Sequence, residues 1–337
     1  MKDIVIASTF LVAVSVMPTG AAQADDQPRK SSNPGFFTFD IENDLHVGRD
    51  RHYTSGIRFS WTSPADNPYF DLDDVAPYLP LVDSNDTIRS IHSIGHYIFT
   101  PDVITTPNPD PTDRPYAGWL NLETGIIAEG IDHVDIWTLG IGVTGDPSLG
   151  EWGQKRIHEI VNSPEPLGWD TQLPTEPTFQ LTYSRAWLPE EQDFLGTSLK
   201  LDVQPRMTLS AGTAFVYADL GAIVRVGSQL GRDLTPSRNT MGIVGADYFE
   251  ETENIEWYVY AGAQGRAIVH NMFLDGGVFN SFDRQVNSRN FIGDFQTGIV
   301  VTFGKWRLAG FNTIRTQEFV GQGELDIYGG VQLSFQY

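Results

Sequence analysis

The sequence contains no cysteine, few charged residues and no long apolar run beyond its N-terminal segment. Without cysteine, disulfide frameworks and cysteine-ligated zinc sites are excluded. Only 19% of the 337 residues are charged, and 43 acidic residues against 22 basic ones give a net charge of −21, so nucleic acid is not an expected partner. A membrane-spanning helix needs about 18 consecutive apolar residues, which excludes a helical membrane protein.

Aromatic residues, glycine and proline are abundant instead. Aromatic residues reach 12%, with 33 glycines and 20 prolines. Aromatic side chains favour strands, and glycine and proline favour turns, whereas helical sequences use more alanine, glutamate, lysine and leucine. The composition therefore predicts an all-β protein.

The N-terminus has the pattern of a secretory signal peptide. Lys2 precedes an apolar stretch over residues 4–16, and Ala22-Gln23-Ala24 has the small-x-small pattern of a cleavage site. We expect residues 1–24 to be removed, leaving 25–337 as a single domain. A retained anchor helix is the alternative, but the apolar stretch is shorter than the roughly 20 residues that a span needs.

The C-terminal segment alternates between apolar and polar residues and ends on an aromatic residue. Such alternation over about ten residues is typical of a strand with lipid on one side and a wet lumen on the other. A terminal aromatic residue also resembles the insertion signal of outer-membrane barrels. A soluble sandwich is the alternative for this strand taken alone. The alternating residues are Tyr328, Val331, Leu333, Phe335 and Tyr337 against Gln332, Ser334 and Gln336.

Similar segments recur along the chain, and we predict a transmembrane antiparallel β-barrel of about 12 strands in a Gram-negative outer membrane. A thirteenth candidate over residues 241–249 contains glycines and a charge, and we assign it to a long connection that can fold inside the lumen. The predicted strands are 36–44, 53–62, 88–99, 116–128, 133–144, 178–187, 198–210, 212–226, 256–269, 290–303, 306–318 and 325–337.

With both ends in the periplasm, the connections 45–52, 100–115 and 145–177 lie on the outer side of the membrane. Asn43 falls on the lipid-facing parity of the first strand, where a polar residue should either lie above the hydrocarbon edge or have a function. Thr54 shares the inward parity of the second strand with Arg58. We interpret Asp40, Glu42 and Arg58 as lumen charges that offset one another. His92 and His96 share a strand face, and we interpret them as polar lumen lining, with a metal site as the alternative.

A phrase of the form D-R-x-Y, with a glycine two or three residues later, opens two returning strands, at residues 50–56 and 113–119. We interpret it as a device that joins loop to strand, with arginine paired to a carboxylate and glycine relieving the pleat.

Residues 149–162 have helical rather than strand periodicity, which is unusual in a barrel loop. Asp146 or Ser148 can cap the helix and Pro164 ends it. The imidazole of His158 is suited to accept a proton near neutral pH. One face of this helix is expected to carry Glu151, Gln154, His158 and Val161.

These motifs resemble those of the LpxR-type outer-membrane lipid A 3'-O-deacylases. The resemblance rests on I-E-N-D (41–44), the two D-R-x-Y phrases, G-x-x-x-Q-x-x-x-H (150–158) and P-x-G-W-D-x-Q-L-x-x-E-P (166–177). It implies a twelve-stranded barrel that removes an ester-linked acyl chain from lipid A or lipopolysaccharide in a calcium-dependent reaction.

The resemblance also implies site residues. Asn43, Asp44, Thr54 and His158 correspond to the catalytic residues of the family, and Gln154 in the helix motif is expected to contact substrate. A lysine that the family can carry in the second outer loop is missing, because residues 102–112 contain no basic residue. How the substrate phosphate is held, and which lipid A is used, therefore stay open.

The chemistry can also be argued from the residues. Ester hydrolysis needs a nucleophile, a base and donors for the oxyanion, and the sequence has neither a G-x-S-x-G elbow nor an H-E-x-x-H motif. Water activated by His158 is then the economical nucleophile. A calcium ion at Asp44 would polarise the carbonyl, with Asn43 and Thr54 as hydrogen-bonding groups.

Two other functions remain open from the sequence. One is an outer-membrane lipase or esterase that acts on phospholipid, and the other is a non-catalytic structural barrel or channel. The many bulky aromatic residues argue against a channel. We expect a monomer.

Overall fold

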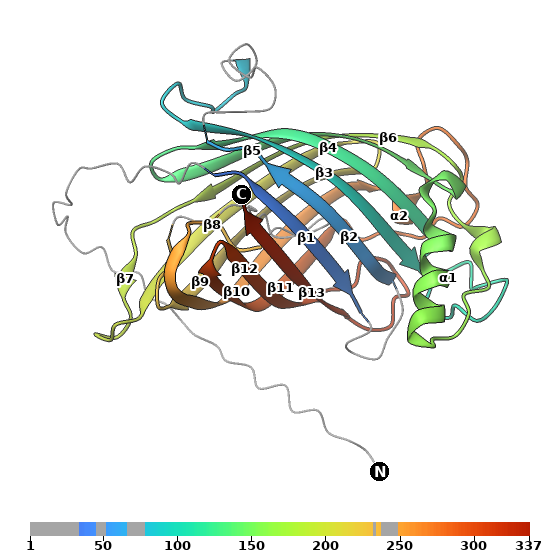
Figure 1. Cartoon of the computed structure of the whole chain (residues 1–337). Helices are drawn as coiled ribbons and strands as arrows, with labels where there is room; N and C mark the ends of the chain where they lie inside the picture. The colour runs from blue at the N-terminus through green and yellow to red at the C-terminus, as the bar shows by residue number, and fades with distance from the viewer. Residues whose placement is uncertain (1–33, 45–51, 66–77, 232–233, 237–248) are drawn as a thin grey trace. The chain divides into compact units, whose positions relative to one another are not determined.

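The computed structural model describes residues 34–44, 52–65, 78–231, 234–236 and 249–337. The predicted signal peptide and most of the candidate segment 241–249 lie outside these residues. The residues from Ser31 to Tyr337 form one compact unit, built almost entirely from strands (Figure 1).

The strands form one antiparallel sheet that closes on itself. β1 pairs with β13, and β6 pairs with β8. Of the 13 strands in the sheet, β7 has only two residues and extends the edge of β8, which leaves the predicted barrel of 12 strands. The strands are β1 Phe36–Asn43, β2 His52–Thr62, β3 Thr87–Thr100, β4 Ala117–Glu129, β5 His133–Thr144, β6 Pro177–Trp187, β7 Gln192–Asp193, β8 Lys200–Gly212, β9 Phe215–Gly227, β10 Thr252–Asn271, β11 Phe291–Gly304, β12 Trp306–Arg315 and β13 Asp326–Gln336.

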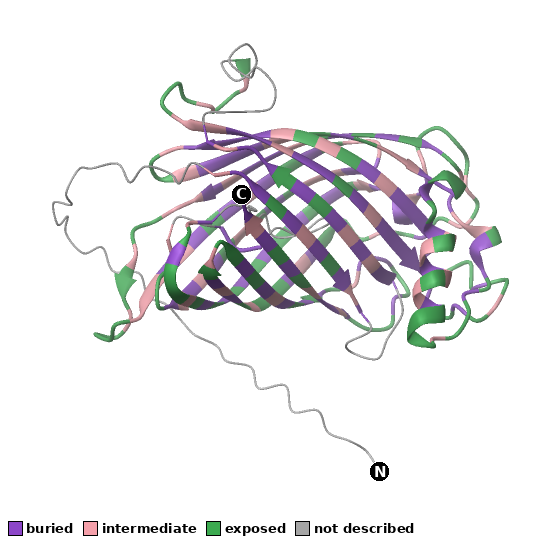
Figure 2. Cartoon of the chain, viewed as in Figure 1, coloured by how far each residue is buried: buried purple, intermediate pink, exposed green. Residues whose placement is uncertain are grey.

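Burial alternates along the strands, as Figure 2 shows, with apolar side chains outside and polar ones inside. On β1, Phe37 is 55% exposed whereas Asp40 is 2% exposed. Asp40 accepts a hydrogen bond from Arg58 Nη2 at 2.9 Å. A charge excluded from both water and lipid is costly unless it is paired. The interpretation of Asp40 and Arg58 as offsetting lumen charges is therefore confirmed.

A β-bulge in β2 changes the predicted direction of Thr54. The register between β2 and β3 shifts between Tyr53 and Ser55, so Thr54 is the extra residue. Tyr53 turns into the interior aromatic cluster, and the Thr54 hydroxyl lies 2.7 Å from that of Thr100. The inward parity predicted for Thr54 from Arg58 was wrong, because strict alternation does not continue through a bulge.

His92 and His96 also lie on the side opposite to the predicted one. They pair across the sheet with Trp61 and Ile57, which belong to the outer face of β2. The rings of His92 and Trp61 are 4.9 Å apart. These histidines therefore contribute to the outer wall and not to the lumen.

Aromatic clusters fill the interior near both ends of the barrel. At the end reached by β1, the ring of Phe99 stacks on that of Phe273 at 4.4 Å, and Phe273 belongs to the short helix α2 (Met272–Asp275). At the opposite end, Phe36 packs against Phe249 with ring centroids 5.3 Å apart. Bulky aromatic side chains therefore occupy part of the interior at both levels, as the aromatic content predicts.

The predicted loop helix is present as α1, Gly150–Val161, at the end of the barrel that we call the outer end (Figure 1). Neither Asp146 nor Ser148 caps it. Both belong to a 3-10 turn, Asp146–Ser148, and Ser148 donates its hydroxyl to Gly145 O instead. Leu149, with φ 62°, occupies the N-cap position. No helix of the described residues is long and apolar enough to span a membrane.

Candidate functional site

Asn43 lies at the outer end of β1, between Ser55 of β2 and Gly329 of β13. It is half-buried and shares the outward face of β1 with Ile41, as its parity predicts. Its side-chain nitrogen donates to the backbone oxygen of Thr54 at 2.9 Å. The bulge in β2 presents this oxygen to Asn43, so the local distortion fixes the amide.

Thr54 continues the arrangement to the third strand. Its hydroxyl shares a hydrogen bond of 2.7 Å with the hydroxyl of Thr100, the last residue of β3. Both threonines are at most 3% exposed. Asn43, Thr54 and Thr100 therefore form a hydrogen-bonded series across the outer ends of three neighbouring strands, which we call the rim series. Sequence reasoning missed Thr100, although its spacing from His96 and Ile98 would have placed it on the same face.

Asp44 follows Asn43 directly and is only 3% exposed. Among the described residues, no group of three or more histidine, cysteine or acidic side chains is placed to hold a metal ion. A calcium ion at Asp44 would therefore need carbonyl, amide, hydroxyl, water or substrate oxygens to complete its shell. Calcium accepts such ligands in irregular geometry, so Asp44 fits one part of the expected donor set.

Two glycines bring α1 against the barrel wall. A Cβ on Gly118 of β4 would lie 2.8 Å from Gly150 Cα, and a Cβ on Gly150 would lie 2.7 Å from Gly118 Cα. One turn later, a Cβ on Gly153 would lie 2.9 Å from His96 of β3. The helix thus advances from β4 onto β3, the strand that carries Thr100. Gly118, the glycine of the second D-R-x-Y phrase, therefore leaves the space that the helix backbone occupies.

His158 lies on the buried face of α1 together with Gly150 and Gln154. Its side chain is 4% exposed, and Nδ1 lies 2.5 Å from the carbonyl oxygen of Pro164. Because a carbonyl only accepts, Nδ1 carries the proton and Nε2 is the basic nitrogen of the neutral ring. Val161, predicted on the same face, is 50% exposed.

Gln154 is fixed within the protein. Its side-chain oxygen accepts a hydrogen bond of 2.8 Å from Trp169 Nε1, and Gln154 is 2% exposed. Trp169 lies in a 3-10 turn, Trp169–Thr171, and packs on Tyr116 with ring centroids 5.0 Å apart. These contacts make Gln154 a positioning residue for α1, and its contact with substrate stays a prediction.

Other residues of the sequence motifs hold the outer loops. Arg114 donates to Glu318 at 2.7 Å, which confirms the predicted pairing of this arginine with a carboxylate. Glu176 accepts backbone N–H groups of the loop after α2, at 3.1 Å from Val278 and 3.3 Å from Phe279. The motif residues therefore act largely as supports for α1 and the loops around it.

The basic side chains of α1 lie beside carboxylates. Lys155 forms an ion pair of 2.8 Å with Glu151, and this hydrogen bond raises the pKa of Lys155. Arg156 pairs with Glu159 at 2.7 Å. The two side chains place positive charge near the outer end, where the loop 102–112 contains no basic residue.

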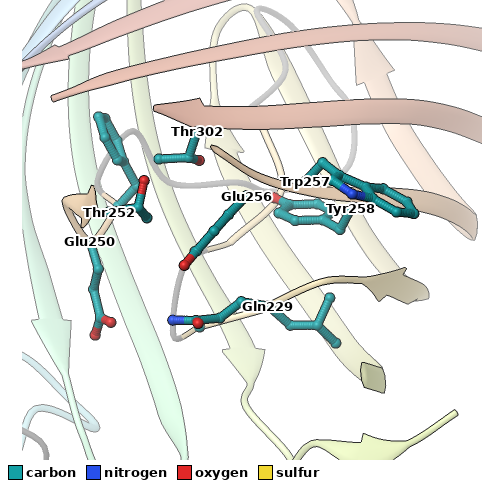
Figure 3. A pocket seen from close by; sticks show the side chains of 10 residues that line it. Gln229, Glu250, Thr252, Glu256, Trp257, Tyr258 and Thr302 are labelled. Carbon is teal, nitrogen blue, oxygen red and sulfur yellow. The ribbon is translucent and has the colours of Figure 1, made fainter. Parts of the chain in front are cut away.

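A separate pocket lies at the other end of the barrel, between the start of β10 and the end of β11 (Figure 3). It holds two carboxylates but no histidine, and it is remote in the strand order from Asn43 and Thr54. It therefore lacks an imidazole, the group expected to act as the base. Its lining residues are Gln229, Leu230, Gly231, Phe249, Glu250, Thr252, Glu256, Trp257, Tyr258 and Thr302.

A closed antiparallel barrel with an apolar outer wall and paired charges inside defines an outer-membrane β-barrel. Comparison with known proteins gives the family. The family model described as outer membrane protein LpxR matches residues 5–337, and the chain therefore belongs to the LpxR family and is a protein of the outer membrane.

The fold matches that of a solved structure of LpxR. LpxR from Salmonella typhimurium superposes with a TM-score of 0.70 at 17% identity, covering 90% of this chain and 100% of that chain. The β domain of the Bordetella autotransporter BrkA gives 0.45 at 9% identity, covering 91% of this chain and 99% of that one. No curated protein matches the chain in sequence.

Proposed function

We propose that this barrel is a carboxylic ester hydrolase that removes an ester-linked acyl chain from lipid A, by 3'-O-deacylation, in the outer leaflet. The observation that carries the proposal is the hydrogen bond that orients the His158 imidazole. Its Nδ1 is held by the Pro164 carbonyl at 2.5 Å, which leaves Nε2 as a base. It lies on a helix docked on β3, the strand whose Thr100 hydroxyl continues the rim series.

In the proposed reaction, Nε2 of His158 takes a proton from a water molecule as the water oxygen attacks the ester carbonyl carbon. The second N–H of the Asn43 amide and the Thr54 hydroxyl stabilise the oxyanion. The carbon–oxygen bond to the sugar then breaks, and the proton on Nε2 passes to the sugar oxygen. The products are a free fatty acid and a lipid with one restored hydroxyl.

Calcium is part of the proposal, with the Asp44 carboxylate as its protein ligand. When bound, a calcium ion supplies positive charge that polarises the ester carbonyl. The need for a cation is supported by charge, because a protein of net charge −21 and a phosphorylated lipid repel each other unless divalent cations bridge them.

The proposal predicts that His158→Ala abolishes deacylation while the barrel still forms. General-base assistance is worth about 10² to 10⁴ in rate. Mass spectrometry of lipid A from cells expressing the wild type should show loss of one acyl substituent, and this loss should disappear in His158→Ala or with a calcium chelator. His133→Ala is a matched control, because His133 opens β5 at the opposite end of the barrel.

Identical lipid A spectra in the wild type and His158→Ala would contradict the proposal. Lysophospholipid and free fatty acid in place of deacylated lipid A would identify a phospholipid esterase instead. Heat-modifiable migration in gels reports whether each variant forms the barrel.

A further inference from the structure

The two D-R-x-Y phrases of the sequence bind each other at the outer end of the barrel. His52, the third residue of the first phrase, opens β2. Its ring nitrogen Nε2 lies 3.6 Å from a carboxylate oxygen of Asp113, and its carbonyl oxygen accepts from Arg114 Nη1 at 3.4 Å. Asp113 and Arg114 are the first two residues of the second phrase. The phrases therefore do more than join loop to strand, because they connect two outer segments to each other.

A third outer segment meets the same imidazole. Nδ1 of His52 lies 2.5 Å from Oδ1 of Asp326, the first residue of β13. The ring of Phe319 packs edge-on against the imidazole, with centroids 5.4 Å apart. His52 and Asp326 are at most 5% exposed. We call the His52 imidazole with the carboxylates of Asp113 and Asp326 the histidine clamp.

The histidine clamp holds the start of β2 in an unusual backbone conformation. His52 has φ 63°, in the left-handed region that is unfavourable for a residue with a Cβ. It pairs across the sheet with Thr100, and the bulged Thr54 follows two residues later. The Thr54 hydroxyl shares its hydrogen bond with that same Thr100. The position of His52 therefore determines where the bulge places the Thr54 hydroxyl.

The histidine clamp needs a protonated ring. A neutral imidazole carries only one N–H, so its other nitrogen would present a lone pair to a carboxylate. Both carboxylates already serve as acceptors for other groups, which is the role of an ionised carboxylate. Asp113 accepts the backbone N–H of Asp102 at 2.7 Å, and Asp326 accepts from Gln322 Nε2 at 3.0 Å. The arrangement therefore favours the imidazolium form of His52.

The other charged groups around the histidine clamp offset one another. The guanidinium of Arg114 opposes a second positive charge on the ring, but it donates to Glu318 at 2.7 Å. Glu318 also lies 3.6 Å from Arg315 of β12. The two carboxylates of the clamp contact the ring directly, whereas the charge of Arg114 is neutralised by its own carboxylate partner.

We propose that His52 is a positioning residue for the hydrolysis, which as an imidazolium holds the bulge and its Thr54 hydroxyl in place, and that loss of its proton ends activity at high pH. The inference rests on the proposed function. His158 must be neutral to act as the base, so the acid side of the pH profile belongs to His158. The alkaline side belongs to His52, because the clamp opens when the ring loses one proton.

The test is the pH profile of deacylation. Initial rates on purified lipid A with calcium are measured from about pH 6 to 10, a range that includes the loss of a proton from histidine. The rate of His158→Ala is subtracted at each pH. The wild type should give a bell-shaped profile. His52→Gln should lower the rate at neutral pH about tenfold or more, since the hydroxyl is displaced, and should remove the alkaline fall but not the acid one.

Two further variants test the charge itself. His52→Arg keeps a positive charge throughout the range and should retain its rate on the alkaline side. Asp326→Asn leaves the imidazolium with one carboxylate fewer and should move the alkaline fall to lower pH. Asp326→Asn also keeps the inference testable if the His52 variants do not give a heat-modifiable barrel.

His133→Gln is the matched control. His133 also lies between two carboxylates, 2.8 Å from Asp132 and 3.3 Å from Asp135, but at the opposite end of the barrel. Its profile should equal that of the wild type. An unchanged alkaline fall in both His52→Gln and Asp326→Asn would overturn the inference.

A measurement without substrate separates this inference from the proposed function. Hydrogen exchange at C2 of the His52 ring, followed by mass spectrometry, gives the pH at which the ring loses its proton, and this pH should coincide with the alkaline fall. If His158→Ala abolishes deacylation but the two pH values differ, only the role of His52 is wrong. If the wild type leaves lipid A intact at every pH, the proposed function fails.

Discussion

At the scale of single residues, a β-bulge determines which groups the outer rim presents. Without the extra residue in β2, Thr54 would point into the lumen with Arg58. With it, the Thr54 backbone oxygen accepts from Asn43 at 2.9 Å and its hydroxyl meets Thr100 at 2.7 Å. Bulges often re-aim side chains next to functional sites. Here the bulge converts a lumen position into a rim position.

The rim series predicts a graded loss of activity. Thr54→Val removes a hydroxyl that we place at the oxyanion and should lower the deacylation rate about 10²-fold or more. Thr100→Val removes only the hydrogen-bond partner of the Thr54 hydroxyl, so the deacylation rate should fall by a smaller factor. Initial rates on purified lipid A provide the measurement.

Thr38→Val is the control for these variants, because the Thr38 hydroxyl bonds Ser334 at 2.9 Å in a comparable buried pair on the inward face of β1. Equal deacylation rates for Thr54→Val and Thr38→Val would show that Thr54 takes no part in the reaction.

At the scale of elements, α1 is joined to the wall by close backbone contact and by one tryptophan. Gly118 and Gly150 allow the first turn to approach β4, and Trp169 fixes Gln154 on the buried face at 2.8 Å. His158 lies one turn further along the same face, so the same contacts determine where its imidazole lies. The helix is therefore a rigid support for the imidazole.

Gly118→Val should push α1 away from the wall while the barrel still closes. The new side chain would occupy the space of Ser148 and the Gly150 backbone. Displacement of a catalytic group by about 1 Å can cost about 10² in rate. We also expect trypsin to cleave the loosened helix at Lys155 or Arg156.

Gly265→Ala, which meets open space, should change neither activity nor cleavage. Full activity of Gly118→Val would show that docking of α1 does not position His158.

At the scale of the whole molecule, the lumen is held together by buried ion pairs. Arg225 donates through Nε to Asp202 at 3.0 Å, and neither residue is more than 4% exposed. Arg89 and Glu129 form a similar pair at 2.6 Å. These pairs join neighbouring strands inside the barrel, and their cost of desolvation is offset only while both partners are present.

Arg225→Leu should destabilise the barrel strongly, because it leaves Asp202 buried without its main partner. Loss of one member of a buried pair costs about 3 to 5 kcal/mol. The double variant Arg225→Leu with Asp202→Leu should recover most of this loss. The temperature at which heat-modifiable migration is lost provides the comparison, and equal temperatures for the single and double variants would contradict the pairing argument.

The sequence by itself determined the barrel, its strand number, the loop helix and the neighbourhood of the candidate residues. Alternation of apolar and polar residues is a local property that lipid outside and charges inside impose on every strand. The direction of Asn43 followed from parity alone, because β1 is regular over its length.

Only the tertiary structure decided which face Thr54 uses and that Gln154 bonds Trp169. These features depend on the register of β2 against β3 and on a contact between a helix and a later loop. A bulge shifts parity by one residue, and the bond to Trp169 forms only where the fold brings the two segments together. Neither feature can be predicted from the periodicity of a single strand.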